Sequence, residues 1–128
     1  MVNAKYHITR AKNSFTELEK IYKTMTIDDF MIEEGVQASK KCMKFRSCYN
    51  QIILSSCRAV LTDACVNYKN IDNLLYYVVE NYDYAGEFKE VNELSNMFCF
   101  AIVIYDVDMA CKAAGLLVSS LRKLVKNL

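Results

Sequence analysis

The chain contains no proline, and each of its ends carries a stripe of apolar residues spaced three or four positions apart. The first stripe comprises Ala4, Ile8, Ala11, Phe15, Leu18, Tyr22 and Met25, and the last comprises Ala110, Ala114, Leu117, Leu121, Leu124 and Leu128. This spacing places the side chains on one face of a helix, which must then be buried against a partner surface. The two terminal segments therefore predict a bundle of packed helices.

The segments between the two stripes also show helical patterns. We expect a first helix over about 3–24, a helical pattern over 27–66, a short helix capped by Asn70, a helix after Gly86, and a last helix capped by Asp106 or Asp108. The pattern does not decide whether 27–66 is one helix or two, although Gly35 is a candidate bend. Within it, we expect polar residues to face water or a second chain: Asn50, Gln51, Ser55 and Ser56.

Length and composition limit the architecture to one globular domain. The chain has 128 residues, of which 53% are hydrophobic and 24% charged, so it can build a single core. We therefore predict an all-α, single-domain antiparallel bundle of four to six helices over residues 1–128. No apolar run reaches the roughly 20 residues that cross a bilayer, and residues 1–10 lack a signal-peptide core. We expect no membrane association and a cytoplasmic location.

The six cysteines lie at 42, 48, 57, 65, 99 and 111, with no CxxC pair. Several fall on the apolar phase of a helix, where free cysteine behaves as a small hydrophobe. We therefore expect reduced core thiols rather than a disulfide framework or a redox site. His7 is the single histidine and is distant in sequence from the cysteines. The sequence predicts no metal site and no cofactor.

The chain offers no recognisable catalytic motif. A nucleophile needs a neighbouring base, and His7, expected on the exposed or half-buried flank of the first helix, has no such partner in sequence. With three glycines, the chain has no phosphate-binding G-x-x-x-x-G-K or G-x-G-x-x-G loop. We predict that the protein is not an enzyme.

Charge is segregated along the chain although the net charge is only +1. Residues 36–69 carry six basic side chains and one acid, and residues 70–108 carry eight acids and one base. Either these segments attract each other within the bundle, or the basic segment forms a face for nucleic acid or another acidic partner. On the second interpretation the candidate partner-binding residues are Lys40, Lys41, Lys44, Arg46 and Arg58.

From about Ala38 to Leu75 the order of features resembles the HEPN group of helical proteins. The resemblance is carried by Tyr49-Asn-Gln-Ile-Ile-Leu-Ser-Ser-Cys-Arg-Ala-Val-Leu61, then Asn70-Ile-Asp-Asn-Leu-Leu75, and later Val91-Asn-Glu-Leu94 and Ile104-Tyr-Asp106. Members of that group are often dimeric ribonucleases, or non-catalytic partners of nucleotidyltransferases in toxin–antitoxin and defence modules. Their ribonuclease signature is an arginine followed four to six residues later by histidine, which this sequence lacks.

The resemblance implies a binding role without nuclease activity. We therefore expect a non-enzymatic, self-associating interaction protein that binds a partner protein of nucleotidyltransferase or defence type, or nucleic acid. The alternative is a small viral or mobile-element effector that captures a helix of a host defence or death-pathway protein in a groove.

Overall fold

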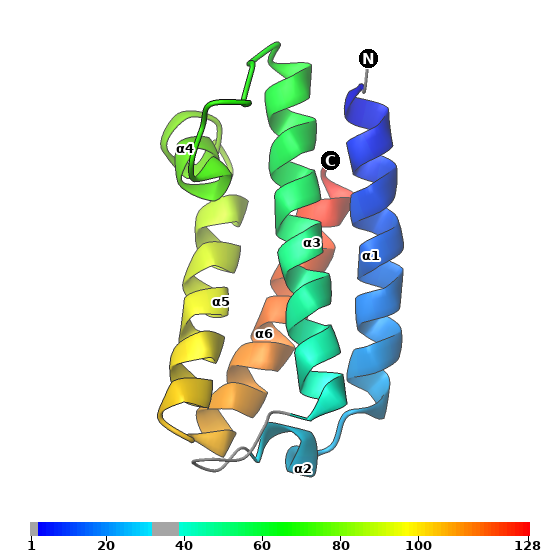
Figure 1. Cartoon of the computed structure of the whole chain (residues 1–128), viewed down its shortest axis with the longest axis vertical. Coiled ribbons are helices and arrows are strands. Elements are labelled where there is room, and N and C mark those ends of the chain that lie inside the picture. The colour runs from blue at the N-terminus through cyan, green and yellow to red at the C-terminus, as the bar shows by residue number, and fades with distance from the viewer. Residues whose placement is uncertain (1–2, 32–38) are drawn as a thin grey trace.

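The computed structural model describes residues 3–31 and 39–128, and this part of the chain contains six helices and no strand. They are α1 (Ala4–Thr24), α2 (Ile27–Phe30), α3 (Lys40–Asp63), α4 (Leu74–Asn81), α5 (Glu87–Val103) and α6 (Val107–Lys126). The four long helices run alternately down and up, while α2 and α4 lie at opposite ends of the bundle (Figure 1). The predicted all-α antiparallel bundle is confirmed.

Side-chain caps set where the helices begin. Asn3, Ser39, Asn73 and Asp106 each accept a hydrogen bond from the backbone N–H three residues later, which satisfies an otherwise unpaired donor of the first turn. The prediction of Asp106 is confirmed, but the cap of α4 is Asn73 and not Asn70. The reason is a turn that comes first, closed by a hydrogen bond from the Ile71 N–H to the Tyr68 carbonyl at 3.1 Å.

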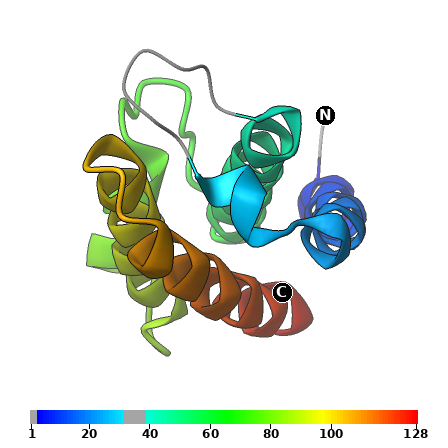
Figure 2. The same cartoon turned by 90° about the horizontal axis from the view of Figure 1, so that it is seen from below.

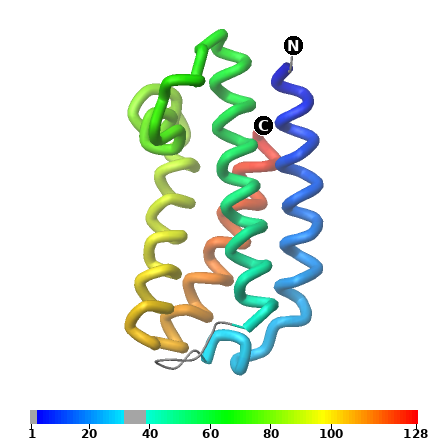
Figure 3. The backbone as a smooth tube through the Cα atoms, viewed as in Figure 1, coloured from blue at the N-terminus to red at the C-terminus, as the bar shows by residue number. Residues whose placement is uncertain are grey.

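In the described parts of the segment 27–66, residues 27–31 and 39–66, there are two helices. The single-turn helix α2 is stabilised where the Thr26 N–H donates to the Asp29 carboxylate at 2.8 Å, and α3 starts afresh at the Ser39 cap. The antiparallel neighbour of α1 is therefore α3, and not the segment that directly follows α1 (Figure 3). The candidate bend at Gly35 lies outside the described residues.

Two helix pairs build most of the core, α1 with α3 and α5 with α6, and α6 runs obliquely to α1 and α3 (Figure 2). Both predicted stripes face this core. Buried members of the stripes are Ala11, Phe15, Leu18, Ala110, Ala114, Leu117, Leu121 and Leu124. Ser55 and Ser56 are also buried, so the expectation that they face water is wrong. Their small side chains suit a position where two helices are in contact.

A cluster of aromatic side chains joins the two pairs. Phe98 of α5 lies 5.4 Å from Phe45 and 5.9 Å from Tyr49 of α3, measured between ring centroids, and Phe30 of α2 contacts the same ring from 6.3 Å. These rings are large, so α3 and α5 stay further apart than the paired helices do. The wider spacing leaves room for a groove on the solvent side of the cluster.

Candidate functional site

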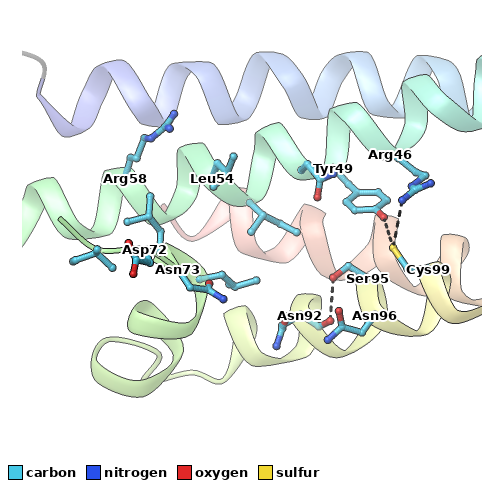
Figure 4. A pocket seen from close by; sticks show the side chains of 15 residues that line it. Arg46, Tyr49, Leu54, Arg58, Asp72, Asn73, Asn92, Ser95, Asn96 and Cys99 are labelled. Atoms are coloured by element: carbon cyan, nitrogen blue, oxygen red, sulfur yellow. Dashed lines mark hydrogen bonds between the residues drawn. The ribbon is translucent and has the colours of Figure 1, made fainter. Parts of the chain in front are cut away.

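A groove of about 730 Å³ lies between α3 and α5, and we call it the α3–α5 groove. Residues 71–75, at the start of α4, close one end of it (Figure 4). Its apolar lining comes from Ile53, Leu54, Ile71, Leu74 and Leu75. A concave surface of this size is large enough to receive a side-chain-bearing segment of another molecule.

Carboxamides form much of the polar lining of the groove. Asn92 and Asn96 project from α5, Asn50 from α3, and Asn73 from the cap of α4. Asn92 and Asn96 are four residues apart and so lie on one helix face. A carboxamide both donates and accepts hydrogen bonds, so this lining can satisfy the polar groups of an incoming chain of either charge.

Arg46, Tyr49 and Cys99 meet in the groove, at the end away from α4 (Figure 4). The Cys99 sulfur lies 3.2 Å from the Tyr49 hydroxyl and 4.0 Å from an Arg46 guanidinium nitrogen. Burial, followed by the hydrogen bond to Cys99, raises the pKa of the Tyr49 phenol above its ordinary value. Tyr49 therefore stays neutral, and Arg46 keeps its charge with sulfur as the partner of its guanidinium.

The structure divides the five predicted partner-binding residues between different surfaces. Arg46 and Arg58 line the α3–α5 groove, whereas the three lysines do not. Lys41 donates from its ammonium to the carbonyl of Thr24 at 3.0 Å, across the end of α1, and Lys40 and Lys44 are exposed. Residues close in sequence on a helix point in different directions, so the five do not form one patch.

Arg58 reaches only the edge of the groove, and its side chain turns toward α1 (Figure 4). There lies His7, which is buried and not half-exposed as expected, with 6% of its surface accessible. The His7 Nε2 atom is 3.3 Å from the Tyr68 hydroxyl, and its Nδ1 has no hydrogen-bond partner. Burial, and then the charges of Arg58 and Arg10, lower the pKa of His7. No sequence signal pointed to this contact, because Tyr68 lies on a distant loop.

The basic and acidic segments do not pair with each other. Across residues 3–31 and 39–128 a single ion pair forms, between Arg122 of α6 and Glu19 of α1 at 2.9 Å. Acids of α5 instead accept from neutral groups: Glu90 from the Ser120 hydroxyl at 2.8 Å, and Glu87 from the Asn127 amide. Among the described residues, no direct ion pair therefore joins segment 36–69 to segment 70–108.

The cysteines are all free: Cys42 and Cys57 are buried, Cys65 is exposed, and the other three are half-buried. Burial raises the pKa of the Cys57 thiol to about 12, which makes it a poor nucleophile. Within the described ranges, no three His, Cys, Asp or Glu side chains are grouped to hold a metal ion. None of the helices described is both long and apolar enough to cross a membrane.

The chain gave no match to a protein-family model, to a curated protein or to a solved structure. The HEPN resemblance therefore stays a prediction, and the site must be interpreted from its own geometry.

Proposed function

We propose that the protein is a non-enzymatic protein-binding module whose α3–α5 groove receives an acidic, amphipathic helical segment of a partner protein. The observation that carries the proposal is Arg46, a guanidinium in an open groove whose hydrogen-bond partner is the Cys99 sulfur, at 4.0 Å, rather than a carboxylate. Arginine forms strong two-point contacts with carboxylates, so this position suits an acidic side chain of a partner.

The shape of the groove supports a helical occupant. The groove follows α3 from Arg46 to its edge at Arg58, twelve residues further along, which corresponds to about 18 Å of helix length. Three turns of a bound helix span the same length, and an amphipathic helix in a groove is a recurrent mode of peptide recognition. The apolar lining from Ile53, Leu54 and Leu75 would bury the apolar face of that helix.

The chemistry of the groove favours protein over nucleic acid. Two cations and one acid, Asp72, line it, so few phosphates would be neutralised there. Its single aromatic residue, Tyr49, is buried in the core and cannot serve as a stacking platform for bases. Tyr76 and Tyr84 are exposed but do not line the groove.

Both classes of partner that the sequence suggested, a nucleotidyltransferase of a defence module and a host defence protein, would bind in this way. A non-catalytic HEPN-like role and an effector role therefore share one testable surface. The proposal concerns that surface and the acidic chemistry of its occupant.

A peptide-display selection against the purified protein tests the proposal. We expect the selected peptides to be acidic and amphipathic, and binding of a synthetic selected peptide, followed by fluorescence anisotropy, to weaken at least tenfold in Arg46→Glu. Lys12→Glu, on the exposed side of α1, is the matched control and should bind as the wild type does.

The same assay separates the groove from the lysine surface. If the triple change of Lys40, Lys41 and Lys44 to Glu abolishes binding while Arg46→Glu does not, the partner surface is at the start of α3 and the groove proposal is wrong. Selection of basic peptides, or of none, would contradict it equally.

A further inference from the structure

A thiol lies in the α3–α5 groove, at the end away from α4. Cys99 is half-buried and lines the groove, whereas Cys42 and Cys57 are fully buried. The Cys99 sulfur lies 3.2 Å from the Tyr49 hydroxyl, and Tyr49 itself is 1% exposed. A phenol fixed in the core therefore holds the sulfur at the lining of an open groove, where a molecule of small-ligand size can reach it.

A cation stands beside this thiol. The guanidinium of Arg46 is 4.0 Å from the Cys99 sulfur, and it lines the same groove. A positive charge at this position attracts anionic molecules and repels cationic ones. The reactivity of Cys99 toward small molecules should therefore depend on the charge that they carry.

A row of carboxamides leads away from the sulfur along α5. Asn92, Asn96 and Cys99 follow one another at intervals of four and three residues, so they lie on one helix face, and all three line the groove (Figure 4). Carboxamides form hydrogen bonds with peptide groups and with carboxylates. A short acidic peptide attached to the Cys99 sulfur therefore has a polar strip along which to lie.

We propose that Cys99 is a site of covalent modification by small peptide disulfides that carry a net negative charge. The Cys99 thiolate attacks one sulfur of the disulfide, a bond forms between Cys99 and that half, and the original sulfur–sulfur bond breaks. Its electron pair leaves on the other half as a thiolate, which takes up a proton in place of the one that Cys99 released. Cys99 is thereby oxidised to a mixed disulfide and the leaving half is reduced to a thiol, so the disulfide is the only oxidant required.

Exposed Cys65 provides an internal reference for this reaction. It does not line the groove, and its neighbours in sequence carry both signs of charge, Asp63 and Lys69. A condition that affects thiols in general changes the rates at both cysteines, whereas the charge of Arg46 acts on Cys99. The ratio of the Cys99 rate to the Cys65 rate therefore isolates the effect of the groove.

Initial rates of mixed-disulfide formation on the full chain, followed by peptide mass spectrometry, test the proposal. The two probes are glutathione disulfide, which is anionic, and cystamine, a disulfide that is cationic. We expect the ratio of the Cys99 rate to the Cys65 rate to be at least tenfold higher with glutathione disulfide. This preference should decrease when the ionic strength rises from about 0.01 M to about 1 M, because salt screens the charge of Arg46.

Substitutions of Arg46 show whether its charge is the cause. Arg46→Gln should remove the preference for the anionic disulfide, and Arg46→Lys, which keeps the positive charge, should retain most of it. Lys12→Gln, on the exposed side of α1, is the matched control and should leave the preference unchanged. Circular dichroism of each variant verifies that the helices are retained, and the salt series tests the same charge in the wild type.

Equal rate ratios for the two disulfides in the wild type overturn the proposal. So does a preference that persists in Arg46→Gln, or one that Lys12→Gln removes as fully as Arg46→Gln does. No partner peptide is present in these measurements, so their outcome is independent of whether the groove binds a helical segment.

Discussion

The contact between α3 and α5, which we call the α3–α5 seam, differs from the two close helix pairs in the size of the side chains that lie between the helices. Ala110, Ala113 and Ala114 are buried on α6, which packs mainly against α5, and Ala11 is buried on α1, which packs mainly against α3. The seam is spaced by Phe45, Tyr49 and Phe98 instead. Phe45 also meets Tyr22 of α1, at 6.0 Å between ring centroids. Helix axes approach as closely as their contact residues permit, so small buried residues favour a close pair, and the aromatic cluster between α3 and α5 leaves a groove.

This contrast shows how a bundle of uniform helices can acquire one distinctive surface. The groove needs no inserted loop or extra domain, because the aromatic cluster fills the interior of the seam and its solvent side stays open. The polar lining above the cluster, Asn50, Asn92 and Asn96, is then available for binding.

The largest expected difference between the core and the α3–α5 seam is in the reactivity of their cysteine thiols. Cys57, with a pKa raised to about 12 by burial, carries about a thousandfold less thiolate than an ordinary cysteine near neutral pH. We expect iodoacetamide to modify exposed Cys65 first, then half-buried Cys99 in the groove, and Cys57 last, as measured by peptide mass spectrometry. Equal rates at Cys99 and Cys57 would mean that the seam is as closed as the core.

Removal of the Phe98 ring, which lies between α3 and α5, should cause the next largest effect, a loss of stability. Phe98 is fully buried, and truncation of a buried phenylalanine costs about 3–5 kcal/mol of unfolding free energy. We expect a loss of this order for Phe98→Ala in urea denaturation. Phe100→Ala is the matched control, because Phe100 is 57% exposed. Similar losses in the two variants would show that the aromatic cluster does not hold the helices together.

An enlarged side chain should lower the unfolding free energy where two helices pack closely and should be tolerated in the lining of the α3–α5 groove. Ala11 is completely buried on α1, and an inserted leucine there should cost about 1–3 kcal/mol. Asn96→Leu adds bulk to the exposed lining of the groove, where the unfolding free energy should change by less than about 0.5 kcal/mol. Denaturant midpoints of the two variants give the comparison, and the reverse order would contradict it.

The smallest expected effect is the pH dependence of stability contributed by buried His7, which contacts half-buried Tyr68. The groups near His7 are Tyr6 and Arg10 of α1, Arg58 of α3 and Tyr68 of the following loop. Because the pKa of His7 is lowered in the folded chain, the unfolded chain binds the proton more strongly. Stability is therefore retained above the ordinary histidine pKa of about 6.5 and falls as the pH drops below it.

We expect His7→Gln to lose less unfolding free energy than the wild type between about pH 7.5 and about pH 5.5, since glutamine does not titrate. Urea unfolding at the two pH values measures the difference. An unchanged pH dependence in the variant would show that other groups account for it.

Local signals in the sequence were sufficient for most helix boundaries. The range expected for the first helix, about 3–24, agrees with Ala4–Thr24, and Asp106 caps α6 as expected. A cap needs only a side chain and a backbone N–H three residues away, and an apolar stripe needs only regular spacing. Both are properties of neighbouring residues, so they can be recognised without knowledge of the fold.

Expectations that depended on distant contacts were less accurate. Ser55 and Ser56 are polar, but they are buried, and His7 is buried against Tyr68, sixty-one residues away. The α4 cap moved from Asn70 to Asn73 because the Tyr68–Ile71 turn precedes the helix. In each case the position of another segment decided the outcome.

The sequence by itself determined that the chain is an all-α bundle, because the period of its apolar residues and its capping side chains are encoded locally. Only the tertiary structure separated Arg46 from Lys40, Lys41 and Lys44 and placed it across from Cys99, fifty-three residues along the chain. That arrangement depends on which helices pair closely and which are held apart by Phe45 and Phe98. Helix spacing arises from side chains that meet in space, and no stretch of neighbouring residues records it.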